Sequence, residues 1–303
     1  MKTYPECVPC LLRQALEGAR HATDDEAVVE EVLRSAGRMV ANVDLEAPTP
    51  LHIGEIHRNI RRLTGDPDPY RAAKDRFNRT VLNLYPDLKE LIGRSPNPLE
   101  TALLLAVGGN EIDMIVDAGL EKADIGESVK AFLSIPLHGS LIDEFKSSVR
   151  SAQEILYLGD NAGEIVLDRL LMEELPTEKI TYVVKGNPVI NDVTMEDARA
   201  CGLTELVEVI DNGTDLPGTV LDQCADAFRE RFFRADLVIS KGQGNYESLS
   251  DVNRNLFFLF KAKCQVITLH LGYEVGSPVM IHTRGGDRPG NHSATYAQPN
   301  SGT

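Results

Sequence analysis

Apolar residues in the first half of the chain recur at intervals of three and four, which is the spacing of one face of an α-helix. The stretch "AVVEEVLRSAGRMVANV" shows this period, and turn clusters such as "TGDPDPY" and "RSPNPLE" separate the helical segments. Up to about residue 148 no segment alternates between apolar and polar residues as a strand would. Residues 1–148 are therefore predicted to form an all-helical domain.

The pattern changes at about residue 152, where short apolar runs begin to alternate with helical stretches. The runs are "EILYLG", "ITYVVK", "LVEVI", "ADLVISK" and "QVITLHLG", and "NYESLSDVNRNLFFLF" is the helical stretch before the last of them. This alternation indicates a parallel sheet covered on both faces, the α/β class. The predicted α/β domain spans residues 149–283, and the Gly-, Pro- and Ser-rich tail, 284–303, is predicted to be disordered.

Composition and charge narrow the range of partners. The 31 basic and 46 acidic residues give a net charge of −15, which repels nucleic-acid backbones and anionic lipid headgroups. The most apolar stretch, "TALLLAVGGNEIDMIVDAGL", carries charged residues, so we expect no membrane span. The N-terminus lacks the apolar core of a secretion signal, and the odd number of five cysteines argues against a disulfide framework. We expect a cytoplasmic protein with no nucleic-acid or membrane partner, and the oligomeric state stays open.

Polar side chains stand where the predicted strands end. Asp160 and Asn161 follow the first strand, and Asn191 and Asp192 follow the second, whereas "NGTDLPG" after the third is typical of a turn. Right-handed crossovers place the carboxyl ends of parallel strands at one edge of a sheet, where its ligands bind. Two aspartates and an asparagine offer hard oxygen ligands, which magnesium and manganese prefer. The strand ends therefore predict a divalent-metal site.

The fourth predicted strand ends in "SKGQGNYE", which brings a different chemistry to the same edge. Lys241 supplies a positive charge, and Gly242 and Gly244 let backbone N–H groups approach a phosphate closely, with Asn245 next in the loop. A dinucleotide site is not indicated, because "GDNAG" after the first strand lacks the G-x-G-x-x-G spacing and carries an acid. A phosphate at this edge would be held by a metal and Lys241.

Six blocks of the chain resemble, in order, those of the metal-dependent damage-control phosphatases, a family once catalogued as domain of unknown function 89. In the second half these blocks are "GDNAGEIVLD", "KGNPVINDVTMEDA" and "ADLVISKGQGNYESL". In the first half, "ECVPCLLRQA", "GDPDPYRAAKDRFN" and "GGNEID" are similar to the family's cysteine-containing subfamily I. The resemblance runs from about residue 5 to about residue 275. It implies a helical domain packed on a Rossmann-like, three-layer α/β/α domain with a mainly parallel sheet.

The resemblance also implies an activity, the hydrolysis of phosphate monoesters of small metabolites, often damaged or side products, with a divalent cation. We expect sugar phosphates or nucleotides as substrates, and manganese, nickel, cobalt or magnesium as the cation. Carried over by motif, the metal ligands would be Asp160, Asn161 and Asp192. The loop from Lys241 to Asn245 would hold the phosphate.

The predicted catalytic residues are Asp160, Glu164 and Lys241, and they leave the mechanism open. Asp160 is a candidate metal ligand and also a candidate nucleophile that would form a covalent intermediate. Glu164 lies in the first turn of the following helix, where it would orient water or a ligand, although an acid there also compensates the helix dipole.

Two pairs of residues in the first half are further candidates. Cys7 and Cys10 form a lone C-x-x-C, interpreted either as two buried residues at a helix start or as accessory metal or redox ligands. Asn110 and Asp113 lie three residues apart and would share one face of a helix. They are predicted to face the substrate, with helix capping by Asn110 as the alternative.

Two other functions fit the same pattern. A Rossmann-like sheet with an acidic first turn also binds S-adenosylmethionine in methyltransferases, but this chain lacks a Gly-rich first loop and would leave Lys241 without a task. A non-enzymatic module that binds a metal or a nucleotide is the other possibility. Metal-dependent release of phosphate would support only the phosphatase.

Overall fold

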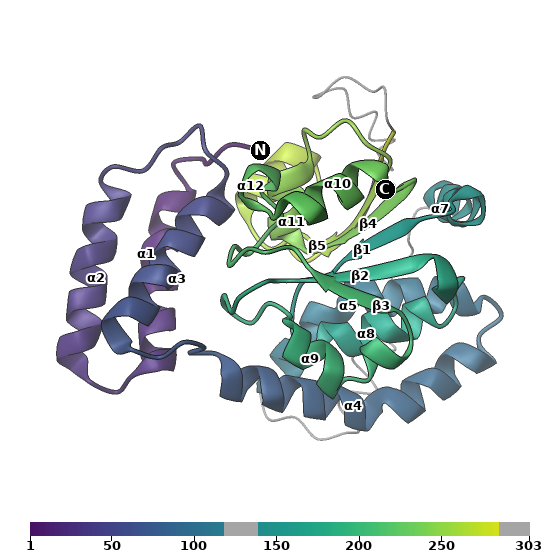
Figure 1. Cartoon of the computed structure of the whole chain (residues 1–303), viewed down its shortest axis with the longest axis horizontal. Coiled ribbons are helices and arrows are strands. Elements are labelled where there is room, and N and C mark those ends of the chain that lie inside the picture. The colour runs from purple at the N-terminus through teal and green to yellow at the C-terminus, as the bar shows by residue number, and fades with distance from the viewer. Residues whose placement is uncertain (118–138, 285–303) are drawn as a thin grey trace, which may run out of the picture.

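The computed structural model describes the backbone of residues 1–117 and 139–284 and the side chains of 1–109 and 141–284. Figure 1 shows a group of helices at one side and a sheet with helices on both of its faces. The side chains of Asn110 and Asp113, and the tail from residue 285 onward, lie outside the described residues. Among the described helices, none is both long and apolar enough to cross a membrane.

The first three helices form a small core of their own. They are α1 (Cys7–Ala22), α2 (Glu26–Val40) and α3 (Thr49–Thr64). Local signals delimit them: Asp25 caps α2 by accepting the N–H of Ala27 at 2.9 Å, and α3 ends at Gly65 in a left-handed conformation. Their facing sides bury Leu11, Ala15, Val29, Val32, Ile56 and Ile60.

The central sheet has six strands in the spatial order β3-β2-β1-β4-β5-β6. All neighbours pair in parallel except β6, which runs antiparallel to β5 at the edge. The strands are β1 (Ile155–Leu158), β2 (Ile180–Val184), β3 (Glu208–Asp211), β4 (Leu237–Lys241), β5 (Leu256–Lys261) and β6 (Pro278–Thr283). The predicted α/β class with a mainly parallel sheet is confirmed.

Both faces of the sheet are covered, because the strands alternate their side chains between two cores. In β1, Ile155 and Tyr157 face one core, while Leu156 and Leu158 face the other. The first core is closed by α4 (Arg71–Arg94), α5 (Pro98–Asp117), α7 (Gly139–Ser151), α8 (Glu164–Met172) and α9 (Met195–Ala200). The second is closed by α10 (Asp226–Arg234), α11 (Gln243–Leu249) and α12 (Gln265–Leu271). Figure 1 shows the resulting three layers.

Two predicted elements near the end of the sheet are wrong. "QVITLHLG" forms the helix α12 and not a strand: its buried residues, Ile267 and Leu271, lie four apart, and Gly272 ends the helix in a left-handed conformation. "LFFLFK", predicted as helix, is the strand β5, and the antiparallel strand β6 has no counterpart in the prediction. The run at β5 is buried on both faces, and such a short apolar run carries no period that separates strand from helix.

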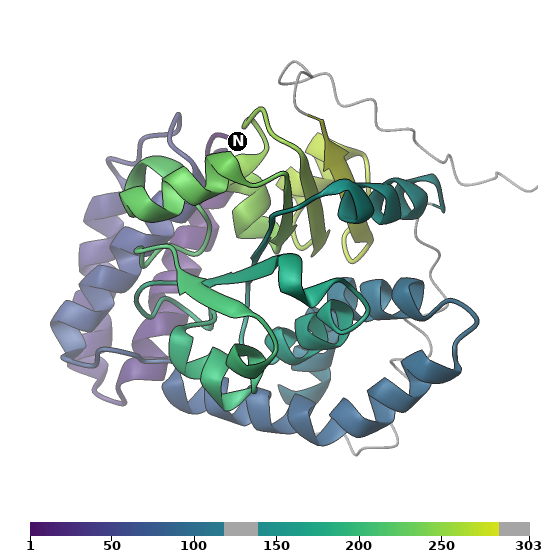
Figure 2. The same ribbon diagram turned by 45° about the vertical axis from the view of Figure 1, so that its right-hand side comes forward.

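The helices of the first half are divided between two cores. Helices α1–α3 pack on one another, whereas α4 and α5 pack against α8 on the sheet. Figure 2 shows α4 running along the side of the molecule that α8 and α9 occupy. The packing changes between α3 and α4, while the predicted boundary at residue 148 falls within α7. The domain limits stay a prediction.

Ion pairs and a hydrogen bond connect helix α3 to the loops at the carboxyl ends of the strands. Arg58 and Arg61 both pair with Asp215, and Arg61 also donates to the carbonyl of Pro188 at 2.8 Å. The amino group of Met1 pairs with a carboxylate just after α11 at 2.9 Å. These contacts hold α1–α3 beside the carboxyl edge of the sheet, as Figures 1 and 2 show.

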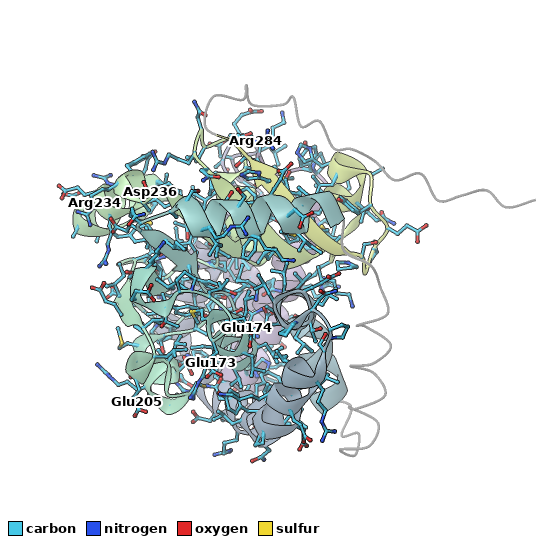
Figure 3. The ribbon with its side chains drawn as sticks, turned by 90° about the vertical axis from the view of Figure 1, so that its right-hand side faces the viewer. Glu173, Glu174, Glu205, Arg234, Asp236 and Arg284 are labelled. Atoms are coloured by element: carbon cyan, nitrogen blue, oxygen red, sulfur yellow. The ribbon has the colours of Figure 1, made fainter. Side chains whose placement is uncertain are left out.

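The opposite, amino-terminal edge of the sheet carries charged residues that pair locally. Figure 3 looks onto this edge, with Arg234 and Asp236 labelled. Arg234 donates to Glu154 at 2.9 Å, and Asp236 accepts the backbone N–H groups of Gln153 and Glu154. The candidate site lies at the other edge.

Candidate active site

The loops after β1 and β2 are joined by a short backbone bridge. The N–H of Val193 donates to the carbonyl of Asp160 at 2.8 Å, and Asn161 and Asp192 pair as in an antiparallel ladder. Asp160, Asn161 and Asp192 are 8%, 6% and 3% exposed. The structure therefore brings the three predicted metal ligands together at the carboxyl edge of the sheet.

This edge is also a topological switch point. Strands β1 and β4 are neighbours although β2 and β3 come between them in the sequence, and such a reversal opens a crevice at the carboxyl ends. Ile190, in the wall of the cavity two residues before Asp192, has a φ of 44°. It is the only non-glycine residue with positive φ among those described. For a β-branched residue this costs roughly 1–3 kcal/mol, a strain typical of functional sites.

The carboxylates of the site are buried and repel one another. Burial, followed by the charges of Glu164 and Asp192, raises the pKa of Asp160 to about 8. Burial also raises the pKa of Asp192 to about 6, against the opposing effect of Lys185, whose ammonium lies 3.5 Å away. The Oδ2 atom of Asp192 is the oxygen that faces this ammonium, and it accepts no shorter hydrogen bond from the described residues. Two crowded, buried carboxyl groups suit a bound cation.

Asn161 is the predicted metal ligand that carries an amide. Among the side chains that the structure describes, no three His, Cys, Asp or Glu residues form a ligand cluster. The Nδ2 atom of Asn161 donates to Asp160 Oδ2 at 3.0 Å and to Glu164 Oε1 at 3.1 Å. Both donors of the amide face carboxyl groups, so its oxygen is the atom that remains as a candidate third ligand.

Lys241 does not line the cavity. It follows Leu237 and Ile239 on the same face of β4, so its side chain points toward α8. There its ammonium lies 2.6 Å from Asp168 and 3.2 Å from Glu164, and the residue is 1% exposed. Burial by itself lowers the pKa of Lys241, but the two carboxylates outweigh it and raise that pKa. The structure thus places this cation in the core, paired with two carboxylates.

The rest of the "KGQGN" loop makes mainly internal contacts. Gly242 has a φ of 82°, and a Cβ atom there would lie 2.1 Å from the carboxyl carbon of Asp160, so only glycine fits behind this carboxylate. Asn245 is fully buried and donates to backbone carbonyls at the ends of β4 and β1, at 2.8 and 3.3 Å. Of Gly242, Gly244 and Asn245, only Gly244 lines the cavity, together with the neighbouring Gln243.

A cavity of about 840 Å³ lies over these carboxylates, between the sheet and α1–α3. Its sheet side includes Asp160, Asn161 and Asp192, and its cations are Arg76, Lys261 and Lys263. Lys263, in the exposed loop after β5, is near enough for its charge to lower the pKa of both Asp160 and Asp192. The cavity therefore carries basic side chains near the two aspartates, and Glu17 and Glu247 line it as well.

Two residues near the site, Asp168 and Lys263, are absent from the residues predicted from the sequence, although the sequence contains a pattern that points to each of them. Asp168 lies four residues after Glu164 in "GEIVLD", and so shares its helix face. Lys263 lies just after β5, the last parallel strand, and Lys241 lies at the end of β4. Because "LFFLFK" is predicted as helix, the end of β5 is not recognised as a strand end.

Cys7 and Cys10 lie half-buried at the start of α1, and neither lines the cavity. The hydroxyl of Thr49 donates to the Cys7 sulfur at 3.8 Å, and Arg13 donates to the Cys10 sulfur at 3.9 Å. Burial raises the pKa of the Cys7 thiol, which leaves it protonated. An accessory role for this pair stays a prediction.

The raised pKa of Asp160 predicts how the metal-free protein responds to pH. The folded state holds this proton more tightly than the unfolded chain, so stability should fall as pH rises toward the folded-state pKa of about 8. His57, whose pKa burial lowers to about 4 from 6.5, acts in the opposite direction only below 6.5. Urea titrations of the EDTA-treated protein from pH 6.5 to 8 should show this loss. Asp160→Asn should flatten the slope, and an unchanged slope would show that Asp160 is ionised throughout.

The sequence of this chain is similar to those of known proteins. Residues 3–279 match the family model described as the damage-control phosphatase ARMT1-like domain. A damage-control phosphatase from Archaeoglobus fulgidus is 34% identical over 92% of this chain and 98% of its own length. An uncharacterised protein from Methanocaldococcus jannaschii is 33% identical over 93% of this chain and 95% of its own.

A solved structure shares the fold as well. The crystal structure of a DUF89 family protein from Pyrococcus horikoshii superposes with a TM-score of 0.85 at 31% identity, over 94% of this chain and 99% of that one. The expected resemblance is thereby confirmed over nearly the whole chain. This chain belongs to the damage-control phosphatase ARMT1-like family.

Proposed function

We propose that this protein is a metal-dependent phosphatase that removes phosphate from small phosphorylated metabolites, damaged or side products among them. Its family membership supports a phosphatase. The observation that carries the metal dependence is the buried set Asp160, Asn161 and Asp192, joined by one backbone bridge at the floor of a cavity. A volume of about 840 Å³ suits sugar phosphates or nucleotides. The five free thiols are consistent with the cytoplasmic location that we also propose.

The cation, for which we propose manganese, nickel, cobalt or magnesium, would be held by Asp160, Asn161 and Asp192. When bound, it supplies positive charge and lowers the pKa of a water molecule. The chain's own part would be to hold these three side chains together and to keep bulk water from them. The alternative, in which Asp160 attacks the phosphorus atom, would leave a phosphorylated protein that mass spectrometry detects after an acid quench.

The substrate phosphate would lie between the metal ligands and Lys263. This lysine takes the role that the sequence suggests for Lys241, because it lines the cavity while Lys241 is paired in the core. The organic part of the substrate would extend toward α1 and α4. There the rings of His21 and Tyr70 lie 4.2 Å apart, with Phe77 in the same wall.

The decisive experiment measures phosphate release from a panel of phosphate monoesters. The protein is first dialysed against EDTA and then assayed with and without each of the four cations. We expect turnover only with metal, because uncatalysed hydrolysis of these esters is extremely slow. The function would be refuted if a folded, metal-loaded protein released no phosphate from any ester.

Replacing Asp192 with asparagine tests the metal site directly. We expect Asp192→Asn to weaken manganese binding by more than about 100-fold, since even the hydrogen-bond partners of metal ligands are worth 10–100-fold. Titration calorimetry measures the affinity. The matched control is Asp211→Asn, which changes an exposed aspartate at the end of β3 whose carboxylate only accepts the N–H of Gly213. Equal manganese affinity in the two variants would remove Asp192 from the site.

A further inference from the structure

Asp168 is a buried carboxylate that lies beneath the candidate site without reaching the cavity. It is 0% exposed, on the face of α8 that packs against the sheet. Three donors surround it: the hydroxyl of Tyr157 at 2.8 Å, the hydroxyl of Tyr182 at 2.9 Å and the ammonium of Lys241 at 2.6 Å. Tyr157 and Tyr182 are register partners on β1 and β2, so both strands aim a donor at the same carboxylate.

The contacts continue from Asp168 to the candidate metal ligands without a break. Lys241 reaches from Asp168 to Glu164 Oε2 at 3.2 Å, and the other oxygen of Glu164 accepts the amide of Asn161 at 3.1 Å. The same amide donates to Asp160 at 3.0 Å. Each group along this path is at most 8% exposed, so water does not compete for its partners.

Two glycines make room for this path. A Cβ atom at Gly159 would lie 2.3 Å from the hydroxyl of Tyr182, and one at Gly109, on α5, would lie 2.6 Å from Cγ of Glu164. Both distances are below any real contact, so an alanine at either position would displace the neighbouring side chain. The backbone is thus shaped around the side chains of Tyr182 and Glu164.

Stability alone does not account for so many charges in a core. A buried ion pair often contributes less than apolar residues of the same volume, because each charge loses its hydration. This arrangement fixes the orientation of the Asn161 amide. Lys241 holds Glu164 in place, so the amide nitrogen donates to both Glu164 and Asp160, and the amide oxygen is turned away from these two groups. Reversing the amide would place that oxygen against the Glu164 carboxylate, whose other oxygen Lys241 holds.

We propose that Asp168 is a positioning residue that, through Lys241 and Glu164, sets the orientation of the Asn161 amide and so tunes metal affinity. The consequence for metal rests on the proposed function, whereas the orientation of the amide does not. Asp168 itself touches neither metal nor substrate in this proposal.

The test compares Asp168→Asn with Glu173→Gln, a carboxylate at the end of the same helix that pairs with Lys89 and Arg169 outside this path. We expect Asp168→Asn to weaken manganese binding about tenfold or more and Glu173→Gln to leave it unchanged. The visible spectrum of the cobalt-loaded protein should change in the first variant only. Gly109→Ala, which displaces Glu164 from the other side, should weaken binding in the same way, and the double variant should lose less than the two losses combined.

A measurement without metal separates this proposal from the proposed function. In the metal-free protein the side-chain NH₂ resonances of Asn161 should be protected from solvent exchange, and Asp168→Asn should abolish the protection. Tyr182→Phe, which removes one donor at nearly constant volume, should show the same effects more weakly and serves if Asp168→Asn does not fold. Protection that persists in a folded variant would overturn the proposal, whether or not the wild type binds metal. The proposal would also be overturned if Asp168→Asn lowered stability but left the manganese affinity within twofold of the wild type and the cobalt spectrum unchanged.

Discussion

Replacing Lys263 with alanine is expected to lower kcat/KM for a phosphate monoester by about 100-fold or more, with little change in stability. The loss is of the size seen when one donor to a developing negative charge is removed, about 3–4 kcal/mol. Lys263 is the exposed cation whose charge acts on both Asp160 and Asp192 across the cavity. Steady-state kinetics with saturating manganese measures the effect, and urea unfolding should differ from the wild type by no more than about 0.5 kcal/mol.

A charge-conserving variant controls for the shape of the side chain. Lys263→Arg keeps the positive charge at the cavity wall and should retain most of the activity. Full activity in Lys263→Ala would show that the phosphate is neutralised elsewhere, with Arg76 and Lys261 as the remaining cations of the wall.

Lys241→Ala is expected to act mainly on stability, lowering the free energy of unfolding by about 3–5 kcal/mol. The variant leaves Asp168 and Glu164 buried without the ammonium that contacts both, at 2.6 and 3.2 Å. Chemical denaturation of the metal-free protein measures the loss. Lys263→Ala is its matched control, because it removes the same charge from a surface loop.

The two lysine variants together separate the sequence-based role of Lys241 from the role that the structure gives it. If Lys241→Ala had the wild-type denaturation midpoint but a large loss of turnover, Lys241 would meet the phosphate after all. Combining it with Asp168→Asn refines the result: the double variant should lose less stability than the single losses combined, because the two side chains are in contact.

Much of the site was accessible from the sequence, for a local reason. Apolar runs mark buried strands, and parallel strands share one carboxyl edge, so the side chains after β1 and β2 had to converge. This argument brings Asp160, Asn161, Asn191 and Asp192 to one edge, and the family resemblance selects three of them, Asp160, Asn161 and Asp192, as metal ligands. The structure places these three on one backbone bridge. The turn after β3 was also predicted from the sequence: the side chain of Asn212 accepts the N–H of Thr214 at 3.0 Å, as is typical of asparagine in turns.

The sequence by itself determined the α/β class with its parallel edge, and it predicted the oxygen ligands there, because period, caps and turns depend on neighbouring residues. Only the tertiary structure decided that "LFFLFK" is a strand, since a run buried all round has no period to read. It also decided which lysine faces the cavity. Alternation along β4 fixes the face of Lys241, but only the packing of α8 on that face supplies Asp168 and Glu164 as its partners. The approach of Lys263 to Asp160 likewise joins strand ends about a hundred residues apart, which local patterns do not encode.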